Sequence, residues 1–275
     1  MTAAGRARAD GITTDVLIVG AGPIGLALAA DLGTRGVDCI VLEKHRESAT
    51  IHPKIMNVGV RTMEYCRRLG VATQVRGWGF PPEYPQDTAF VTSMSGHEIA
   101  RIAAPSLNDA VELPESPEQN THCPQNWFDD FVLKRAQSFS SVRFRYGHEL
   151  VHFEDGGDHV TATVLDRGSE RVQSFTARYL VGCDGYQSTV RKQLSIPMTG
   201  RGKVDYSMNI LFRSDDLKTS HPFSDALRFV LIGPEGTWAT LWSVDGRDLW
   251  RLTVYGTDAQ SIEAADPHDA MARLQ

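Results

Sequence analysis

Glycine and acidic residues near the start of the chain have the types and the spacing that bind a dinucleotide. Residues 20–25 form a Gly-x-Gly-x-x-Gly sequence, built from Gly20, Gly22 and Gly25. In such a sequence the first glycine permits a tight turn, the second leaves room for a pyrophosphate, and the third lets a helix pack closely on a strand. Glu43 follows at the spacing where a carboxylate accepts hydrogen bonds from an adenosine ribose.

The elements that must position these residues can be read from the same stretch. Residues 15–19 form a β-branched, nearly all-apolar run, which predicts a strand buried on both faces. A helical pattern follows to about residue 35, with Pro23 in its first turn, and a second apolar run over 37–42 stops at Glu43. Strand, glycine turn, helix, strand and terminal acid in one unit predict a Rossmann-type dinucleotide site.

Composition narrows the class of protein. The chain has 275 residues, 41% of them hydrophobic and 23% charged, with a net charge of −6. This balance is typical of a globular protein, and an acidic chain without a Lys/Arg cluster is not expected to bind nucleic acid. No apolar run is long enough to span a membrane, and the first residues do not resemble a secretory signal. Four widely spaced cysteines without a Cys-x-x-Cys pair predict free thiols in the cytoplasm.

One stretch matches a zinc-binding pattern but is predicted to have another role. His148 and His152 stand in a His-Glu-x-x-His sequence, which binds zinc when both histidines share one face of a helix. Here the sequence continues into a Gly156-Gly157 turn, which predicts a hairpin strand instead. In a strand the two histidines would lie about 13 Å apart, too far for one ion. We therefore expect no metal site.

The remaining pattern predicts an α/β protein with two domains. Residues 1–200 are expected to form the nucleotide-binding domain with a β-meander excursion, and residues 201–275 an antiparallel, substrate-binding sheet. Asn57 and Asn126 are expected to cap helices, the second with Asp129 at its third position. The other expected elements are strands over 88–94, 98–103, 142–146, 149–154, 159–165, 171–176, 178–182, 205–213, 227–233, 237–243 and 248–255, a short helix after Ser188, and a helix over 266–275.

The first unit and three further stretches together resemble the flavin-dependent aromatic hydroxylases, the family of para-hydroxybenzoate hydroxylase and phenol hydroxylase. The stretches are His52-Pro53-Lys54 with the Asn57–Gly70 segment after it, Cys123-Pro124-Gln125, and residues 178–185 with Ser188 and Arg191. The resemblance implies an FAD site and NAD(P)H as co-substrate. It places Lys54 where the family often has an arginine near the FAD pyrophosphate, and Gln125 beside the ribityl chain.

Further contacts follow from the same resemblance. The backbone at Leu150 would pass the adenine, and Asp184-Gly185 would touch FAD and, transiently, the NAD(P)H pyrophosphate. Arg191 would meet phosphate. The full set of cofactor-binding residues expected in this way is Gly20, Gly22, Pro23, Ile24, Gly25, Glu43, Lys44, Lys54, Gln125, Leu150, Asp184, Gly185 and Arg191.

The reaction implied is hydroxylation of a phenolic or other aromatic substrate by O2 through a flavin C4a-hydroperoxide. Phenols react faster as phenolates, so a nearby base or cation is expected; His45, His52, Tyr206 and Arg213 are candidates, and none is singled out as catalytic. The expected ring-binding region is the sheet that carries Met208, Leu211, Trp238 and Trp242.

Several alternatives stay open at this stage. The family's later Gly-Asp motif is absent, which predicts that the chain is the N-terminal part of a longer enzyme, with a homodimer of that enzyme left open. A halogenase, an epoxidase or a ring-reducing flavoenzyme would share the same motifs. An ordinary NAD-dependent dehydrogenase would lack the Asp184-Gly185 stretch, and a fragment without catalytic activity is also open.

Overall fold

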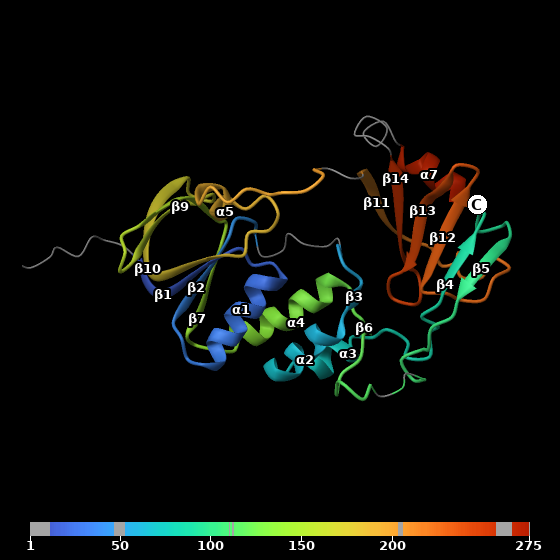
Figure 1. Cartoon of the computed structure of the whole chain (residues 1–275), viewed down its shortest axis with the longest axis horizontal. Helices are drawn as coiled ribbons and strands as arrows, with labels where there is room; N and C mark the ends of the chain where they lie inside the picture. Colours follow the sequence, from blue (N-terminus) through green and yellow to red (C-terminus); the bar gives the residue numbers. More distant parts are fainter. Residues whose placement is uncertain are drawn as a thin grey trace, which may run out of the picture. The chain divides into compact units, whose positions relative to one another are not determined.

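The computed structural model describes residues 12–46, 53–109, 111, 113–202, 206–256 and 266–274 (Figure 1). The chain divides into two compact units, each made of several segments. The first comprises residues 1–55, 65–75 and 125–198, and the second residues 56–64, 76–124 and 199–275. Residues 76–124, which lie inside the stretch expected as the first domain, thus group with the second unit.

A six-stranded sheet forms the centre of the first unit. Its strands are β1 (Ile12–Val19), β2 (Cys39–Glu43), β7 (Val142–Tyr146), β8 (His148–Asp155), β9 (Val160–Asp166) and β10 (Arg171–Gly182), in the order β7-β2-β1-β10-β9-β8. β1 runs parallel to β2 on one side and to β10 on the other. Leu17, Ile18, Ile40 and Leu42 are almost fully buried. Apolar runs without alternation therefore form central parallel strands, as expected for a sheet covered on both faces.

The β-meander is confirmed, with one difference from the expected strands. β8, β9 and β10 pair antiparallel in succession. The expected strands 171–176 and 178–182 are a single strand, because β10 continues from its antiparallel partner β9 into a parallel partner, β1. The His-Glu-x-x-His stretch lies in β8, which confirms its expected strand conformation. Among the described residues no group of three or more His, Cys, Asp or Glu could hold a metal ion.

Helices pack on the first sheet and follow its strands. They are α1 (Pro23–Thr34), α4 (Gln125–Gln137), which lies beside α1 in Figure 1, and the short α5 (Thr189–Gln193). Two more helices, α2 (Val60–Leu69) and α3 (Ala72–Arg76), follow one another in the chain. Ser188 accepts a hydrogen bond from the Arg191 nitrogen and caps α5, as expected.

The predictions that Asn57 and Asn126 cap helices are both wrong. Asn57 lies in the short strand β3 (Asn57–Val58), which pairs with β6 (Thr121–His122). The nitrogen of Val60, which opens α2, instead donates to Oδ1 of Asn120, over 3.1 Å. Asn126 lies inside α4, because that helix begins one residue earlier. A cap from a residue distant in sequence leaves no local pattern by which it could be found.

A second six-stranded sheet organises the second unit. It contains β4 (Thr88–Val91), β5 (Glu98–Ile102), β11 (Tyr206–Arg213), β12 (Arg228–Gly233), β13 (Gly236–Ser243) and β14 (Leu249–Gly256), in the order β11-β14-β13-β12-β4-β5. The four late strands are antiparallel, as expected, whereas β4 joins β12 in parallel. Trp250, Phe229, Leu241 and Leu252 form its buried core, together with α7 (Pro267–Leu274).

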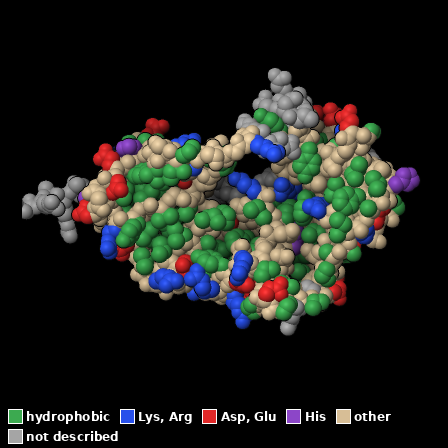
Figure 2. All heavy atoms as spheres, in the orientation of Figure 1, with side chains coloured by type: hydrophobic (Ala, Val, Ile, Leu, Met, Phe, Trp, Pro, Cys, Tyr) green, Lys and Arg blue, Asp and Glu red, His purple; other side chains and the backbone are tan. Residues whose placement is uncertain are grey.

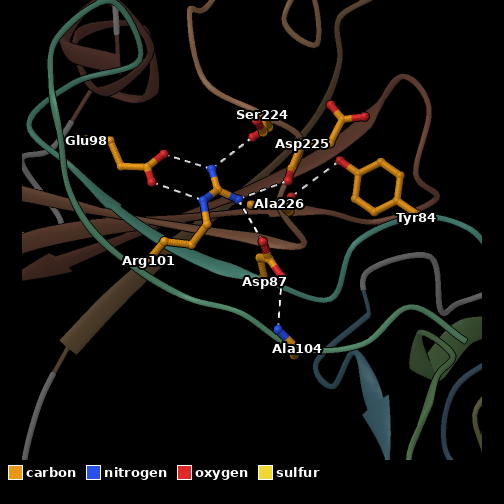
Figure 3. A network of polar contacts seen from close by, with 8 residues as sticks. All are labelled: Tyr84, Asp87, Glu98, Arg101, Ala104, Ser224, Asp225 and Ala226. Carbon is orange, nitrogen blue, oxygen red and sulfur yellow. Dashed lines mark hydrogen bonds and ion pairs between the residues drawn. The ribbon is translucent and has the colours of Figure 1, made fainter. Parts of the chain in front are cut away.

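Arg101 on β5 ties the β4–β5 hairpin to the segment that precedes β12 (Figure 3). Its guanidinium donates to both carboxylate oxygens of Glu98, over 3.0 and 2.8 Å, and to Asp87, over 3.0 Å. It also donates to the backbone oxygens of Ser224 and Asp225, each over 3.1 Å. Because the Arg101 side chain is only 19% exposed, this network is screened less than an ordinary surface ion pair.

The described surface carries both signs of charge. On the face shown in Figure 2, acidic, basic and hydrophobic side chains are interspersed. No helix formed by the described residues combines the length and the apolar character that a membrane crossing requires.

Candidate cofactor-binding site

Three adjacent parallel strands end together in the first unit, and the glycine turn leaves from the middle one. The nitrogen of Gly20 donates to the Leu42 oxygen of β2 over 2.7 Å. On the other side, the nitrogen of Cys183, which follows β10, donates to the Val19 oxygen, also over 2.7 Å. Residues that are far apart in the sequence and are expected to bind the cofactor thus lie at one edge of one sheet. In open α/β folds that edge is where ligands bind.

The three glycines of the turn differ in what a side chain at each position would meet. Gly20 has a φ of +103°, and a Cβ there would lie 2.5 Å from the Cys183 carbonyl oxygen. A Cβ on Gly25 would collide with the Gly20 carbonyl oxygen, so this glycine lets α1 pack against the turn. A Cβ on Gly22 would meet no atom within 4 Å. The space in front of Gly22 is therefore open, at the point where a pyrophosphate is expected.

The start of α1 is the end of that helix at which we expect the FAD pyrophosphate. Pro23 is its first residue, and Gly22 before it provides no side-chain cap. The helix is twelve residues long, so its dipole and its unpaired N–H groups favour a negative group at this end. Ile24, the next residue, is 70% exposed.

Glu43 supports the glycine turn with its carboxylate. Oε2 accepts a hydrogen bond from the Ala21 nitrogen over 2.9 Å, and Oε1 accepts one from the His45 nitrogen over 2.8 Å. A carboxylate has about four acceptor positions, so two remain for the ribose hydroxyls expected here. Lys44 is exposed beside it.

Asp184 occupies the matching position after β10, but its carboxylate is largely engaged. Oδ1 accepts from the Ser188 hydroxyl over 2.5 Å, and Oδ2 accepts from the nitrogens of Thr189 and Val190 over 2.7 and 3.2 Å. Gly185 has a φ of +78°, in keeping with the turn expected there. Asp184 therefore orders the start of α5 as well as lying at the strand edge.

The other expected residues lie in the same unit. Arg191 donates from Nη1 to the Ile196 oxygen over 2.8 Å, while its Nε is buried without a hydrogen-bond partner. Leu150 is buried in β8 next to a bulge in the pairing with β9. Lys54 is exposed. Every residue of the expected FAD set falls within the first unit.

Gln125 is the first residue of α4, and sequence reasoning missed its main partner. Its Nε2 donates to Oδ2 of Asp129 over 3.1 Å. Burial raises the pKa of the Asp129 carboxyl to about 6, against smaller opposing effects of Gln125 and Lys54. The spacing of four residues along a helix was the only sequence signal for this contact. The expected role of Asp129 in capping α4 is not what the structure shows.

Of the candidate bases, His45 lies in the first unit, whereas Tyr206 and Arg213 lie in the second. His45 is exposed after β2, and Arg213 makes an ion pair with Asp248 over 2.6 Å at an exposed position on β11. Tyr206 is at the opposite end of β11, and His52 lies outside the described residues. Met208 and Trp238, expected near the ring, pack against the buried core of the second unit, and Trp242 packs against Phe80, Tyr84 and Leu227.

Comparison with known proteins agrees with this geometry. A sequence model described as FAD binding domain matches residues 13–275. The chain is 30% identical to 2,4-dichlorophenol 6-monooxygenase of Delftia acidovorans over 259 residues, covering 86% of this chain and 44% of the relative. It is 32% identical to phenol 2-monooxygenase of Pseudomonas sp. (strain EST1001) over 256 residues, covering 90% and 40%.

Solved structures show the same fold. The substrate-free rebeccamycin biosynthetic enzyme REBC matches with a TM-score of 0.85 and 36% identity, covering 97% of this chain and 51% of that one. The flavin-dependent monooxygenase PieE, in complex with FAD and substrate, matches with a TM-score of 0.85 and 26% identity, covering 97% and 47%. The chain spans less than half the length of the two monooxygenase relatives above. With its glycine turn, its two strand-end acids and this match along nearly its whole length, the chain belongs to the FAD binding domain family, and the proteins similar to it include monooxygenases of phenol and of 2,4-dichlorophenol and the flavin-dependent monooxygenase PieE.

Proposed function

We propose that this chain binds FAD and forms part of an NAD(P)H-dependent monooxygenase that hydroxylates a phenolic or other aromatic substrate. The observation that carries the proposal is the junction of Gly20, Glu43 and Asp184 at the ends of three adjacent parallel strands. The relatives' names support the aromatic substrate, since they include monooxygenases of phenol and of 2,4-dichlorophenol.

The residues present fit FAD. The open space before Gly22 and the uncapped first turn of α1 suit the pyrophosphate, and Glu43 offers acceptors to the adenosine ribose. Gln125 can offer its amide oxygen to a ribityl hydroxyl, because its Nε2 is engaged elsewhere. When bound, FAD would supply the redox chemistry, taking a hydride from NAD(P)H and activating O2. One oxygen atom would enter the ring as a hydroxyl group, and the other would leave as water.

The protein's own part in this reaction is to bind and orient. Backbone donors at α1 would hold the phosphates, and the carboxylate of Glu43 fixes the turn that positions those donors. We propose the reducing cytoplasm as the compartment, because all four cysteines are free thiols.

The experiment is an FAD titration of the purified chain, followed by assay for activity. We expect a yellow protein that binds FAD with a Kd below about 10 μM. The assay measures oxidation of NADH and of NADPH in the presence of O2 and a panel of phenols, with the oxygenated product identified by mass spectrometry. A chain that does not bind FAD at about 1 mM would refute the proposal.

Two outcomes of the assay would redirect the assignment. A product that carries halogen and forms only when halide is added would indicate a halogenase. FAD binding without any NAD(P)H oxidation, in the chain alone and in the longest natural form of the protein, would indicate a binding module without catalysis.

A further inference from the structure

A largely buried carboxyl group on α4 lies next to the residue expected to contact the flavin chain. Asp129 accepts a hydrogen bond from Gln125 Nε2 through its Oδ2 atom, over 3.1 Å. Its second oxygen, Oδ1, is buried and has no hydrogen-bond partner. Both residues lie in the first unit, one helical turn apart.

This arrangement does not serve the stability of α4. A pair of polar side chains four residues apart stabilises a helix only slightly. A buried carboxylate with one oxygen unpaired costs several times as much. The cost of burying the carboxylate is reflected in the pKa of Asp129, which burial raises to about 6. At neutral pH the group is therefore mostly ionised, at a cost to the fold that an asparagine of the same shape would avoid.

An ionised carboxylate has one property that asparagine lacks, because it accepts hydrogen bonds and donates none. It can therefore bind only the NH2 end of the Gln125 amide. The amide is held in one orientation, with Oε1 directed away from Asp129. An amide or a protonated acid at position 129 could satisfy either orientation, so Oε1 would be presented only part of the time.

We propose that Asp129 is a positioning residue for FAD, which holds the amide of Gln125 so that Oε1 is presented as an acceptor to a ribityl hydroxyl group. The inference rests on the proposed function, because it needs FAD at this edge of the sheet. It assigns Asp129 no contact with the cofactor, since its Oδ1 atom is buried within the protein.

The test compares Asp129→Asn with the parent chain in two measurements. FAD affinity is measured by flavin fluorescence, and the stability of the apo chain by urea unfolding. We expect Asp129→Asn to raise the Kd for FAD about 3- to 10-fold, and to raise the urea midpoint of the apo chain. A residue with a merely structural role would move both measurements in the unfavourable direction.

The second arm asks whether the effect passes through Gln125. In a Gln125→Leu background the amide is gone, so Asp129→Asn should change the Kd by less than about 2-fold. The matched control is Asp130→Asn on the same helix, where the side chain is 46% exposed and pairs with Lys134. It should leave the Kd for FAD unchanged.

The outcomes separate this inference from the proposed function. If the parent and Asp130→Asn bind FAD and Asp129→Asn binds it equally well, the positioning role is wrong and the FAD site stands. An equal loss of affinity in the parent and Gln125→Leu backgrounds, or a lower urea midpoint for Asp129→Asn, also overturns the positioning role. If the parent does not bind FAD, both the inference and the proposed function fail.

Discussion

The backbone nitrogen of Ala21 donates a hydrogen bond to Oε2 of Glu43 over 2.9 Å, so the acid that ends β2 holds the turn that follows β1. The same carboxylate accepts from the nitrogen of His45 through its other oxygen. Glu43 thus shapes the glycine turn, and we propose that its remaining acceptor positions bind the adenosine ribose of FAD. A change at this position should affect both the fold and the cofactor.

Replacement of Glu43 by glutamine should weaken FAD binding about 10-fold and reduce the free energy of unfolding by about 1 kcal/mol. A glutamine can accept from only one of the two backbone nitrogens, since its other end carries N–H donors. Fluorescence titration and urea unfolding measure the two effects. Glu154→Gln on β8, where the side chain is 80% exposed, is the matched control and should change neither. Unchanged FAD affinity in Glu43→Gln would contradict the expected ribose contact.

Substitutions of two glycines in the turn should have different effects on FAD affinity and on the free energy of unfolding. Gly22→Ala should leave the free energy of unfolding within about 0.5 kcal/mol of the parent, because φ is −75° and no atom lies near the new methyl group. It should weaken FAD binding at least about 10-fold, because the methyl group occupies the expected position of the pyrophosphate.

Gly25→Ala should do the reverse, destabilising the apo chain by about 2 kcal/mol or more through the clash with the Gly20 oxygen. Gly59→Ala, whose methyl group would meet nothing closer than 3.8 Å, is the control for both variants. Tight FAD binding by Gly22→Ala would show that the pyrophosphate does not bind in front of Gly22.

Stability should fall on mild acidification because of His122. This side chain is 2% exposed, and its ring nitrogens lie 2.9 Å from the Val244 oxygen and 3.0 Å from Oδ1 of Asn57. Burial lowers the pKa of His122 to about 4, with a smaller opposing effect of Val244. The unfolded chain, where the pKa is near 6.5, then binds more protons between these values, so stability present at pH 7 is lost towards pH 4.

Comparison with His122→Asn isolates this contribution. The difference in the free energy of unfolding between parent and variant should shrink by on the order of 2 kcal/mol from pH 7 to pH 4. Taking the difference removes the opposite effect of Asp129, whose raised pKa favours the folded state at low pH. His97→Asn, at an exposed position, is the control. A difference that does not depend on pH would show that His122 is not held neutral by burial.

Arg101→Met should destabilise the second unit by about 2 kcal/mol, since it leaves Asp87 and Glu98 without their shared partner (Figure 3). Arg101→Lys should recover only part of the loss, because an ammonium group cannot donate to several acceptors in the fork geometry. Lys134→Met, which removes an exposed ion pair with Asp130, is the control and should cost less than about 0.5 kcal/mol. Equal stability of Arg101→Met and the parent in urea unfolding would show that the Arg101 network does not stabilise the second unit.

Much of the first unit could be predicted from the sequence, because its signals are local. The glycine turn, the helix after Pro23 and the strand that stops at Glu43 each follow from a few neighbouring residues. Strand conformation at His148 and His152 could be predicted in the same way, from the turn that follows them. Backbone conformation and apolar periodicity are properties of short segments, so they can be predicted from the sequence alone.

The tertiary structure decided everything that depends on partners far apart in the chain. Only the pairing of β1 with both β2 and β10 brings Glu43 and Asp184 to one edge. The cap of α2 by Asn120, the parallel pairing of β4 with β12 and the joining of two expected strands into β10 are of the same kind. The burial of Asp129 beside Gln125 also depends on what packs around α4. Hydrogen-bond partners and desolvation are set by the folded environment, and no local pattern encodes them.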